Sequence, residues 1–352
     1  MNIDSLVEQF NGCRVLVVGD LMLDEYIWGT ADRISPEAPV PVVRCRDRTH
    51  AAGGAANVVA NIAALGGSPT VCGIVGDDAP GVSLTETLEA FGAEVRGVFR
   101  DGSRCTTRKT RVIAQQQQVV RIDHESHEPV SGEIREKMDG YIRAQVAGVD
   151  GIIFSDYNKG VLTDHHLATW IPLSREQQKI VTAGPKPQSL RDYGGATLLS
   201  FNRSEAYQSV QNLPRTPSPG IERSRDAAEQ EDADPTGAGD ALAANEVDRI
   251  GEHLIEELQC DAITITRGGE GVSVFTFDGQ RLRVPGMPVQ VYDVAGAGDT
   301  FLSAITLALC CGADWATAAG VANAAAACVV RKVGVATTNP QEILQLMGEV
   351  LY

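Results

Sequence analysis

The sequence predicts an α/β fold in which a mostly parallel central sheet is flanked by helices and a small β-sheet protrudes from it. Short apolar runs alternate with segments of helical length along most of the chain, which is typical of a parallel sheet covered by helices. Segments 26–46 and 104–123 mix β-branched residues with prolines or glutamines, a pattern that favours exposed edge strands. These two segments predict the small sheet, which we expect to act as a lid.

Composition limits the classes of protein to consider. The 352 residues, which we treat as a single domain over 1–352, are 43% hydrophobic and include 36 glycines, as suits an α/β enzyme. The net charge of -16 argues against nucleic-acid binding. Eight scattered cysteines form no C-x-x-C pair, so we expect mostly buried thiols. The opening residues do not resemble a secretory signal and no apolar run reaches membrane-spanning length, so we expect a cytoplasmic protein with no membrane or nucleic-acid partner.

The first buried strand, residues 15–18, is followed by Asp20 and Asp24. Ligands of open α/β sheets gather at the carboxyl ends of strands, so both carboxylates are candidates for substrate binding. Their alternative role is that of turn carboxylates.

A double glycine, Gly53 and Gly54, precedes an apolar-periodic helix. It would let a ligand approach the backbone closely, and Asn57, one turn into the helix, could bond a sugar hydroxyl. A plain turn is the alternative.

The middle of the chain repeats the alternation of strands and helices. We expect strands at 70–75, 151–155, 179–182 and 197–200, and helices at 82–91, 131–147 and 164–177. Polar side chains follow several of these strands, namely Asp156, Lys159, Lys186 and the N-x-x-E run of Asn202, Arg203, Ser204 and Glu205. That run could hold a metal-bound phosphate through water, although a helix cap explains it nearly as well.

An irregular acidic insertion is predicted at 211–247, and it contains DPTGAGDAL at 234–242. DVAGAGDTF at 293–301 repeats this motif. We favour the second copy, because a strand at 281–291 should precede it and a buried helix at 301–311 should follow it. In the first copy, Pro235 lacks a backbone donor.

The favoured copy is suited to phosphate chemistry. Gly296 and Gly298 allow successive N–H groups to point at one place, where a helix begins and its dipole favours an anion. Asp299 beside them is our candidate for a base that takes a proton from an attacking hydroxyl. A tight connection with Asp299 as a helix cap is the alternative.

Three ordered motifs resemble the ribokinase (PfkB) family of carbohydrate kinases. The family's early motif, a glycine pair followed by an asparagine, is matched by GGAAN at 53–57, N-x-x-E is matched at 202–205 and D-x-x-GAGD at 293–299. Segments 17–43, 53–67 and 155–162 further resemble the family members that phosphorylate heptose 7-phosphate.

The resemblance implies transfer of the γ-phosphoryl group of ATP, as its Mg²⁺ complex, to the C1 hydroxyl of D-glycero-D-manno-heptose 7-phosphate. The product would be the 1,7-bisphosphate, used for ADP-heptose and lipopolysaccharide core synthesis. Asp299 would be the base, with an anion hole formed by the N–H groups of Gly296, Ala297, Gly298 and Asp299.

The resemblance also assigns binding roles. The nucleotide, with Glu205 reaching the metal through water, would be held by Lys186, Asn202, Arg203, Ser204, Glu205, Thr266, Gly268, Gly269, Gly271 and Asn323. The sugar would be held by Asp20, Asp24, Gly53, Gly54, Asn57 and Asp156. Cations available for the substrate's phosphate are Arg108, Lys109, Arg111, Arg121 and Lys159, and which of them bind is left open.

Relatives often pair through their lids, so a homodimer is expected, and kinase activity alone is expected because no HxGH motif follows. The chain has AGPK at 183–186 and SFN at 200–202 where the family usually has D-P-K and T-P-N. A kinase for another sugar or nucleoside, or a catalytically weak sugar-phosphate-binding protein, therefore remain the alternatives.

Overall fold

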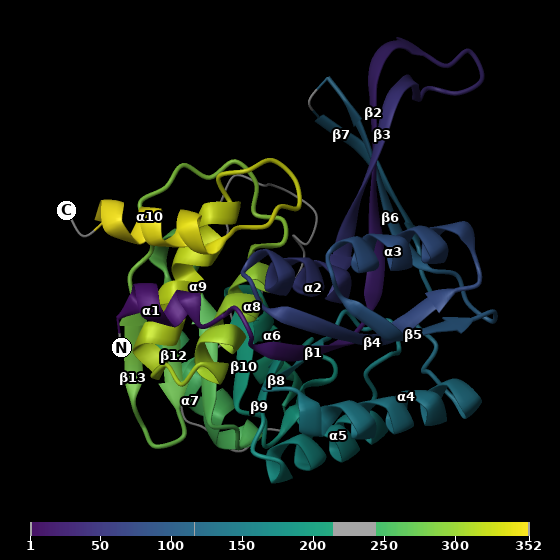
Figure 1. Ribbon diagram of the computed structural model, residues 1–352. Coiled ribbons are helices and arrows are strands. Elements are labelled where there is room, and N and C mark those ends of the chain that lie inside the picture. Colours follow the sequence, from purple (N-terminus) through teal and green to yellow (C-terminus); the bar gives the residue numbers. More distant parts are fainter. Residues whose placement is uncertain (1, 116, 214–243, 351–352) are drawn as a thin grey trace.

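The computed structural model describes residues 2–115, 117–213 and 244–350. Within them, a nine-stranded sheet has the order β13-β12-β11-β10-β9-β8-β1-β4-β5 (Figure 1). Its strands are β1 (Arg14–Gly19), β4 (Ser68–Gly76), β5 (Glu94–Asp101), β8 (Gly151–Ser155), β9 (Ile180–Gly184), β10 (Leu198–Asn202), β11 (Ala262–Thr266), β12 (Val272–Thr276) and β13 (Arg281–Val284). All pairings from β5 to β11 are parallel and only β12 and β13 pair antiparallel, so the predicted mostly parallel sheet is confirmed.

Helices cover both faces of this sheet. They are α1 (Ile3–Glu8), α2 (Ala55–Ala64), α3 (Ala79–Ala90), α4 (Gly132–Gln145), α5 (Asp164–Glu176), α6 (Arg203–Asn212), α7 (Ala244–Leu258), α8 (Ala297–Cys310), α9 (Trp315–Val329) and α10 (Pro340–Val350). Strand β1 shows why its sequence is uniformly apolar. Val15 and Val17 pack into the core with α2, α8 and α9, whereas Leu16 and Val18 pack into the core with α4, α5 and α7.

A second sheet of four strands stands off the main body (Figure 1). The strands are β2 (Leu21–Ile34), β3 (Pro41–Gly54), β6 (Thr107–Ala114) and β7 (Gln117–His124), in the order β3-β2-β6-β7. We call it the small sheet. β2 pairs with β6 in parallel, and the outer pairs are antiparallel. The predicted protruding sheet is confirmed, but β2 and β3 extend beyond 26–46 at both the Leu21 and the Gly54 end, because buried apolar residues keep the chain extended there.

The predicted strand at 281–291 is wrong in its length. β13 ends at Val284, and the chain then runs without regular structure to α8. Pro285 and Pro288 cannot donate to a sheet ladder, which explains the early end. The helix predicted at 301–311 instead begins at Ala297.

The predicted irregular segment 211–247 is narrower at its described ends. Helix α6 continues to Asn212, and α7 begins at Ala244. Residues 214–243, with the first GAGD copy at 234–242, lie outside the described residues.

No helix within the described ranges has both the length and the apolar content needed to cross a bilayer. All eight cysteines are free thiols. Four of them, Cys13, Cys72, Cys260 and Cys328, are buried, fewer than the majority that the sequence predicts.

His166 on α5 is a buried titratable group in one of the two cores. Its ring stacks on Trp170 with centroids 4.4 Å apart, its Nδ1 bonds Val161 O at 2.8 Å, and its Nε2 has no partner among the described residues. Burial lowers the pKa of His166 below the ordinary 6.5. As the pH falls, His166 therefore becomes protonated in the unfolded chain at a higher pH than in the folded protein.

We predict that His166 contributes stability fully above about pH 6.5 and loses this contribution as the pH falls below it. His166→Phe keeps a flat ring but cannot titrate, and should cost about 1 kcal/mol at pH 8 through the lost Val161 bond. The difference in urea-unfolding free energy between wild type and variant should shrink towards acid pH. Parallel stability curves for the two proteins would refute this.

Candidate active site

The centre of the candidate site is the loop that follows β8, and Asp20 holds it in place. Asp20 lies between β1 and β2 and is buried. Its carboxylate accepts N–H bonds from Tyr157 at 2.8 Å, Lys159 at 3.1 Å and Val161 at 3.2 Å. Burial, and then the nearby Asp156, raises the pKa of Asp20 to about 6 although these N–H groups oppose the rise. Asp20 thus has the turn-carboxylate role, and sugar binding by it stays a prediction.

Asp156 fixes the same loop from its other side. It accepts hydrogen bonds from Ser189 Oγ at 2.5 Å, Tyr193 Oη at 2.9 Å and the N–H of Asn158 at 2.8 Å. These contacts leave it only 3% exposed, and a substrate role for Asp156 likewise stays a prediction.

Asp299 lies in the first turn of α8, where the structure places it between two donors. Asn57 Nδ2 donates to its Oδ2 at 2.7 Å, and Tyr157 Oη donates to its Oδ1 at 2.7 Å. Burial raises the pKa of Asp299 to about 6, and the two donors oppose that rise. The helix cap is Gly296, so Asp299 does not have the alternative capping role.

Gly296 is required by its surroundings. Its φ is +77°, and a Cβ there would lie 2.8 Å from Asn57 Nδ2, so only glycine allows Asn57 to reach Asp299. The amides of Gly298 and Asp299 are in the helix's first turn, where no intrahelical acceptor exists. The Ala297 amide, which was expected to join the anion hole, already donates to Val294 O at 3.2 Å.

Asp24 and the double glycine form one packed unit. Asp24 Oδ1 accepts from Arg111 Nη1 at 2.6 Å, and the Arg111 guanidinium lies 5.4 Å from the centre of the Tyr26 ring. A Cβ on Gly53 would lie 2.8 Å from Asp24 Oδ2. Gly54 has a φ of +55° at the start of α2. The glycines are therefore needed for packing whether or not a sugar binds beside them.

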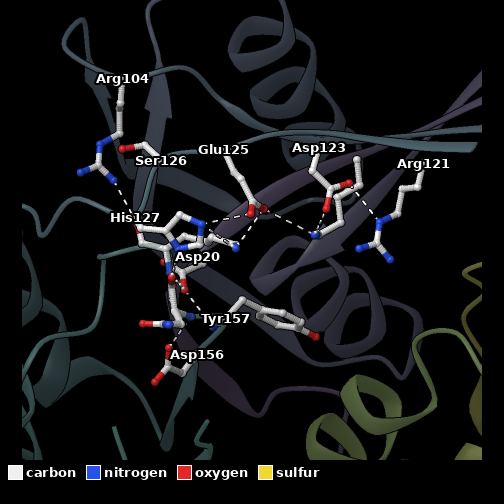
Figure 2. Close-up of polar contacts among 12 residues, drawn as sticks. Asp20, Arg104, Arg121, Asp123, Glu125, Ser126, His127, Asp156 and Tyr157 are labelled. Carbon is white, nitrogen blue, oxygen red and sulfur yellow. Dashed lines mark hydrogen bonds and ion pairs between the residues drawn. The ribbon is translucent and has the colours of Figure 1, made fainter. Parts of the chain in front are cut away.

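Glu125, which lies between Asp123 and His127 in Figure 2, is contacted by two lysines from different elements. Lys159 Nζ lies 2.9 Å and Lys109 Nζ 3.5 Å from Glu125 Oε2. Asp123 extends the cluster, because it pairs with Lys109 at 3.2 Å and with Arg121 at 3.0 Å.

The remaining cations of the small sheet point elsewhere. Arg111 binds Asp24, and Arg108 lies 3.9 Å from Glu25 on the other face of β6. Of the five cations that the sequence offers for a substrate phosphate, the structure thus brings Lys109, Lys159 and Arg121 together.

On the predicted nucleotide side, Asn202 and Glu205 form a capping box for α6. Glu205 N donates to Asn202 Oδ1 at 2.8 Å, and Asn202 N donates to Glu205 Oε2 at 3.0 Å. The other oxygen of Glu205 pairs with Lys186 Nζ at 2.7 Å, and this ammonium lies 5.0 Å from the centre of the Tyr157 ring. Lys186 thus connects the N-x-x-E run to the loop beside Asp299.

The other predicted nucleotide residues are more dispersed. Arg203 pairs with Glu270 and Thr266 Oγ1 donates to Phe201 O at 3.4 Å, while Ser204 lies in the first turn of α6. Asn323 donates to Pro285 O at 2.9 Å. Positive φ angles occur at Gly268 and Gly271, whose turn with Gly269 joins β11 to β12. Direct contacts do not join all of these residues, and their nucleotide roles stay predictions.

The donor atoms fit Mg²⁺ only indirectly. Within 2–115, 117–213 and 244–350, no group of three or more histidines, cysteines, aspartates or glutamates is positioned to hold a metal ion. Glu205, which was expected to reach the metal through water, offers a hard oxygen of the kind that Mg²⁺ prefers, and its Oε1 is paired with Lys186. The predicted metal contact therefore rests on one carboxylate.

Sequence reasoning missed Tyr157 and Glu125. Tyr157 stands in the strand-end run SDYNKG between two predicted site residues, and this position was the available signal. No local pattern marks Glu125, since its importance comes from lysines on two other segments.

Residues 14–342 match the profile of the pfkB family of carbohydrate kinases. The chain is 42% identical over 347 residues to the bifunctional protein HldE of Geobacter metallireducens, covering 99% of this chain and 65% of that protein. The HldE of Geotalea uraniireducens is 41% identical, with 98% and 65% covered. The chain thus spans just under two thirds of the length of these relatives.

The fold resembles that of phosphofructokinase-2 from Escherichia coli, with a TM-score of 0.72 and 16% identity, and the match covers 97% of this chain and 100% of that chain. The chain belongs to the pfkB family of carbohydrate kinases.

Proposed function

We propose that the protein is an ATP-dependent kinase that phosphorylates the C1 hydroxyl of D-glycero-D-manno-heptose 7-phosphate, giving the 1,7-bisphosphate. The observation that carries the proposal is Asp299, a carboxylate in the first turn of α8 held by Asn57 and Tyr157. The likeness to HldE kinases, and the N-terminal segments that resemble heptose phosphate kinases, support the choice of sugar.

Asp299 has the chemistry that a base needs. With a pKa of about 6 it is mostly ionised at pH 7, yet basic enough to take the proton of the C1 hydroxyl as that oxygen attacks phosphorus. Negative charge then increases on the phosphoryl oxygens, and the amides at the start of α8 can stabilise it. Mg²⁺, when bound with ATP, supplies charge neutralisation between the phosphates.

Lys109 and Lys159 are the cations we assign to the substrate's own phosphate. Both pair with the Glu125 carboxylate, so the two ammonium groups already bind an anionic group at this place. A phosphate dianion would compete with Glu125 for the two ammonium groups. Lys159 is two residues from Tyr157, so the loop after β8 would contact both the phosphate and the base.

The cellular setting follows from the chemistry proposed. An enzyme that uses ATP to make the bisphosphate for ADP-heptose and the lipopolysaccharide core would act in the cytoplasm. We also propose a homodimer through the small sheet, because Val119, Val120 and Ile122 on β7 are between 40% and 46% exposed.

Asp299→Asn should lower kcat by at least a hundredfold with heptose 7-phosphate and Mg-ATP, because the amide cannot accept the proton. The coupled release of ADP measures this, and the melting temperature checks the fold. Asp240→Asn, in the other GAGD copy, is the matched control and should leave kcat unchanged. A larger loss from the control would move the base to Asp240.

The pH dependence of kcat should reflect the ionisation of the Asp299 carboxyl group. We expect kcat to fall about tenfold per pH unit below an apparent pKa of about 6, because the protonated carboxyl cannot act as a base. Steady-state rates between about pH 5 and 8 measure this. A kcat that stays constant down to about pH 5 would place this pKa nearer its ordinary value of 3.8 and show that burial does not raise it.

Lys159→Met should raise KM for heptose 7-phosphate about tenfold, because one of two phosphate contacts is lost, and should leave KM for ATP unchanged. Lys137→Met, which removes an exposed lysine paired with Glu133, is the control and should change neither constant. An effect on ATP instead of the sugar phosphate would contradict the assignment.

A further inference from the structure

Tyr157, on the loop after β8, contacts three charged residues, Asp299, Lys186 and Asp20. Its hydroxyl donates to Asp299 Oδ1 at 2.7 Å, and its ring lies under the ammonium of Lys186. Its backbone N–H is held by the buried Asp20 at 2.8 Å. The side chain is therefore fixed at the hydroxyl, the ring and the backbone.

We propose that Tyr157 is a positioning residue that holds the Asp299 carboxylate in place and keeps it ionised for proton transfer. The inference rests on the proposed function, in which Asp299 is the base. Tyr157 lies in segment 155–162 and outside the three family motifs at 53–57, 202–205 and 293–299.

The first argument is geometric. Asn57 on α2 takes one carboxylate oxygen and Tyr157 takes the other, each at 2.7 Å. Two donors from separate elements fix the plane of the carboxylate, whereas one would leave it free to rotate. The remaining lone pairs then point in a defined direction.

The second argument is electrostatic. A partly buried carboxylate tends to keep its proton, and a hydrogen bond to the ionised form opposes this. Burial and the adjacent Asp299 raise the pKa of Tyr157, so the hydroxyl keeps its own proton and stays a donor. Tyr157 therefore accepts no proton itself and acts only through Asp299.

The third argument concerns Lys186. Its ammonium pairs with Glu205 at 2.7 Å and lies 5.0 Å from the centre of the Tyr157 ring. The ring thus helps to keep a cation near the base. Phenylalanine would keep this contact and lose only the hydroxyl, so Tyr157→Phe isolates the bond to Asp299.

Tyr157→Phe should move the acid limb of the kcat–pH profile upward by about one pH unit, which is a tenfold change in the acid dissociation constant of Asp299. KM for both substrates should stay within about twofold of the wild-type value. Tyr141→Phe is the matched control. Tyr141 also donates to a carboxylate, Glu94 Oε2 at 2.7 Å, but it lies on α4 against β5. The control should leave the profile unchanged, and an unchanged profile in Tyr157→Phe would overturn the proposal.

A second measurement does not depend on turnover. In protein labelled with ¹³C at the aspartate carboxyl carbon, the Asp299 signal is the one missing from Asp299→Asn, and its titration midpoint should rise by about one pH unit in Tyr157→Phe. An unchanged midpoint overturns this inference whatever the activity. If the wild type has no kinase activity and the Asp299 midpoint is still higher in Tyr157→Phe than in the wild type, only the proposed function is overturned.

A variant with the opposite effect covers the case in which Tyr157→Phe does not fold. 3-Fluorotyrosine at position 157 is nearly the same size and a stronger donor, so it should lower the Asp299 midpoint. A midpoint that rises or stays constant would overturn the proposal.

Discussion

The buried carboxylate of Asp20 is the contact on which the candidate site depends. It accepts hydrogen bonds from three backbone N–H groups of one loop. The backbone of Asp20 adds two more bonds, because its N–H donates to Ser155 O at 3.2 Å and its carbonyl oxygen accepts from Ala55 N at 2.9 Å. An N–H group buried without a partner is costly, so removing this carboxylate would release the loop. Asp20 therefore holds in position both Tyr157, which contacts Asp299, and Lys159, which contacts Glu125.

The site is thus assembled from segments that are rigid for different reasons. Asn57 is fixed by α2, and Asp299 by the first turn of α8, whose close approach requires Gly296. The loop after β8 is fixed by carboxylates, and Lys109 by its place on β6. Strand ends and helix starts meet at the carboxyl edge of the parallel sheet, where ligands of such sheets bind.

Much of this architecture could be predicted from sequence, because periodicity is a local signal. The run of apolar residues in β1 identifies a strand buried on both faces, and the packing of Val15 and Leu16 into opposite cores confirms it. The strand-end rule also singled out Asp20 and Lys159, which the structure brings to one loop.

What the sequence could not predict depends on contacts between distant segments. Tyr157 and Asp299 are 142 residues apart, and Lys109 and Lys159, on two other segments, both contact Glu125. Asn202 and Glu205 fit both a phosphate-site pattern and a helix-cap pattern, and the structure shows that they form a capping box. The strand predicted at 281–291 ends at Val284, because Pro285 and Pro288 cannot donate to a sheet ladder.

The junction of the two sheets has a mechanical consequence. The chain leaves the central sheet at Asp20 and returns from β3 at Gly54, and these crossings are joined by the bond from Ala55 N to Asp20 O. Both crossings therefore share one pivot. A displacement of the small sheet at these two crossings would therefore act on Asp20, the same residue whose carboxylate holds the backbone N–H of Tyr157.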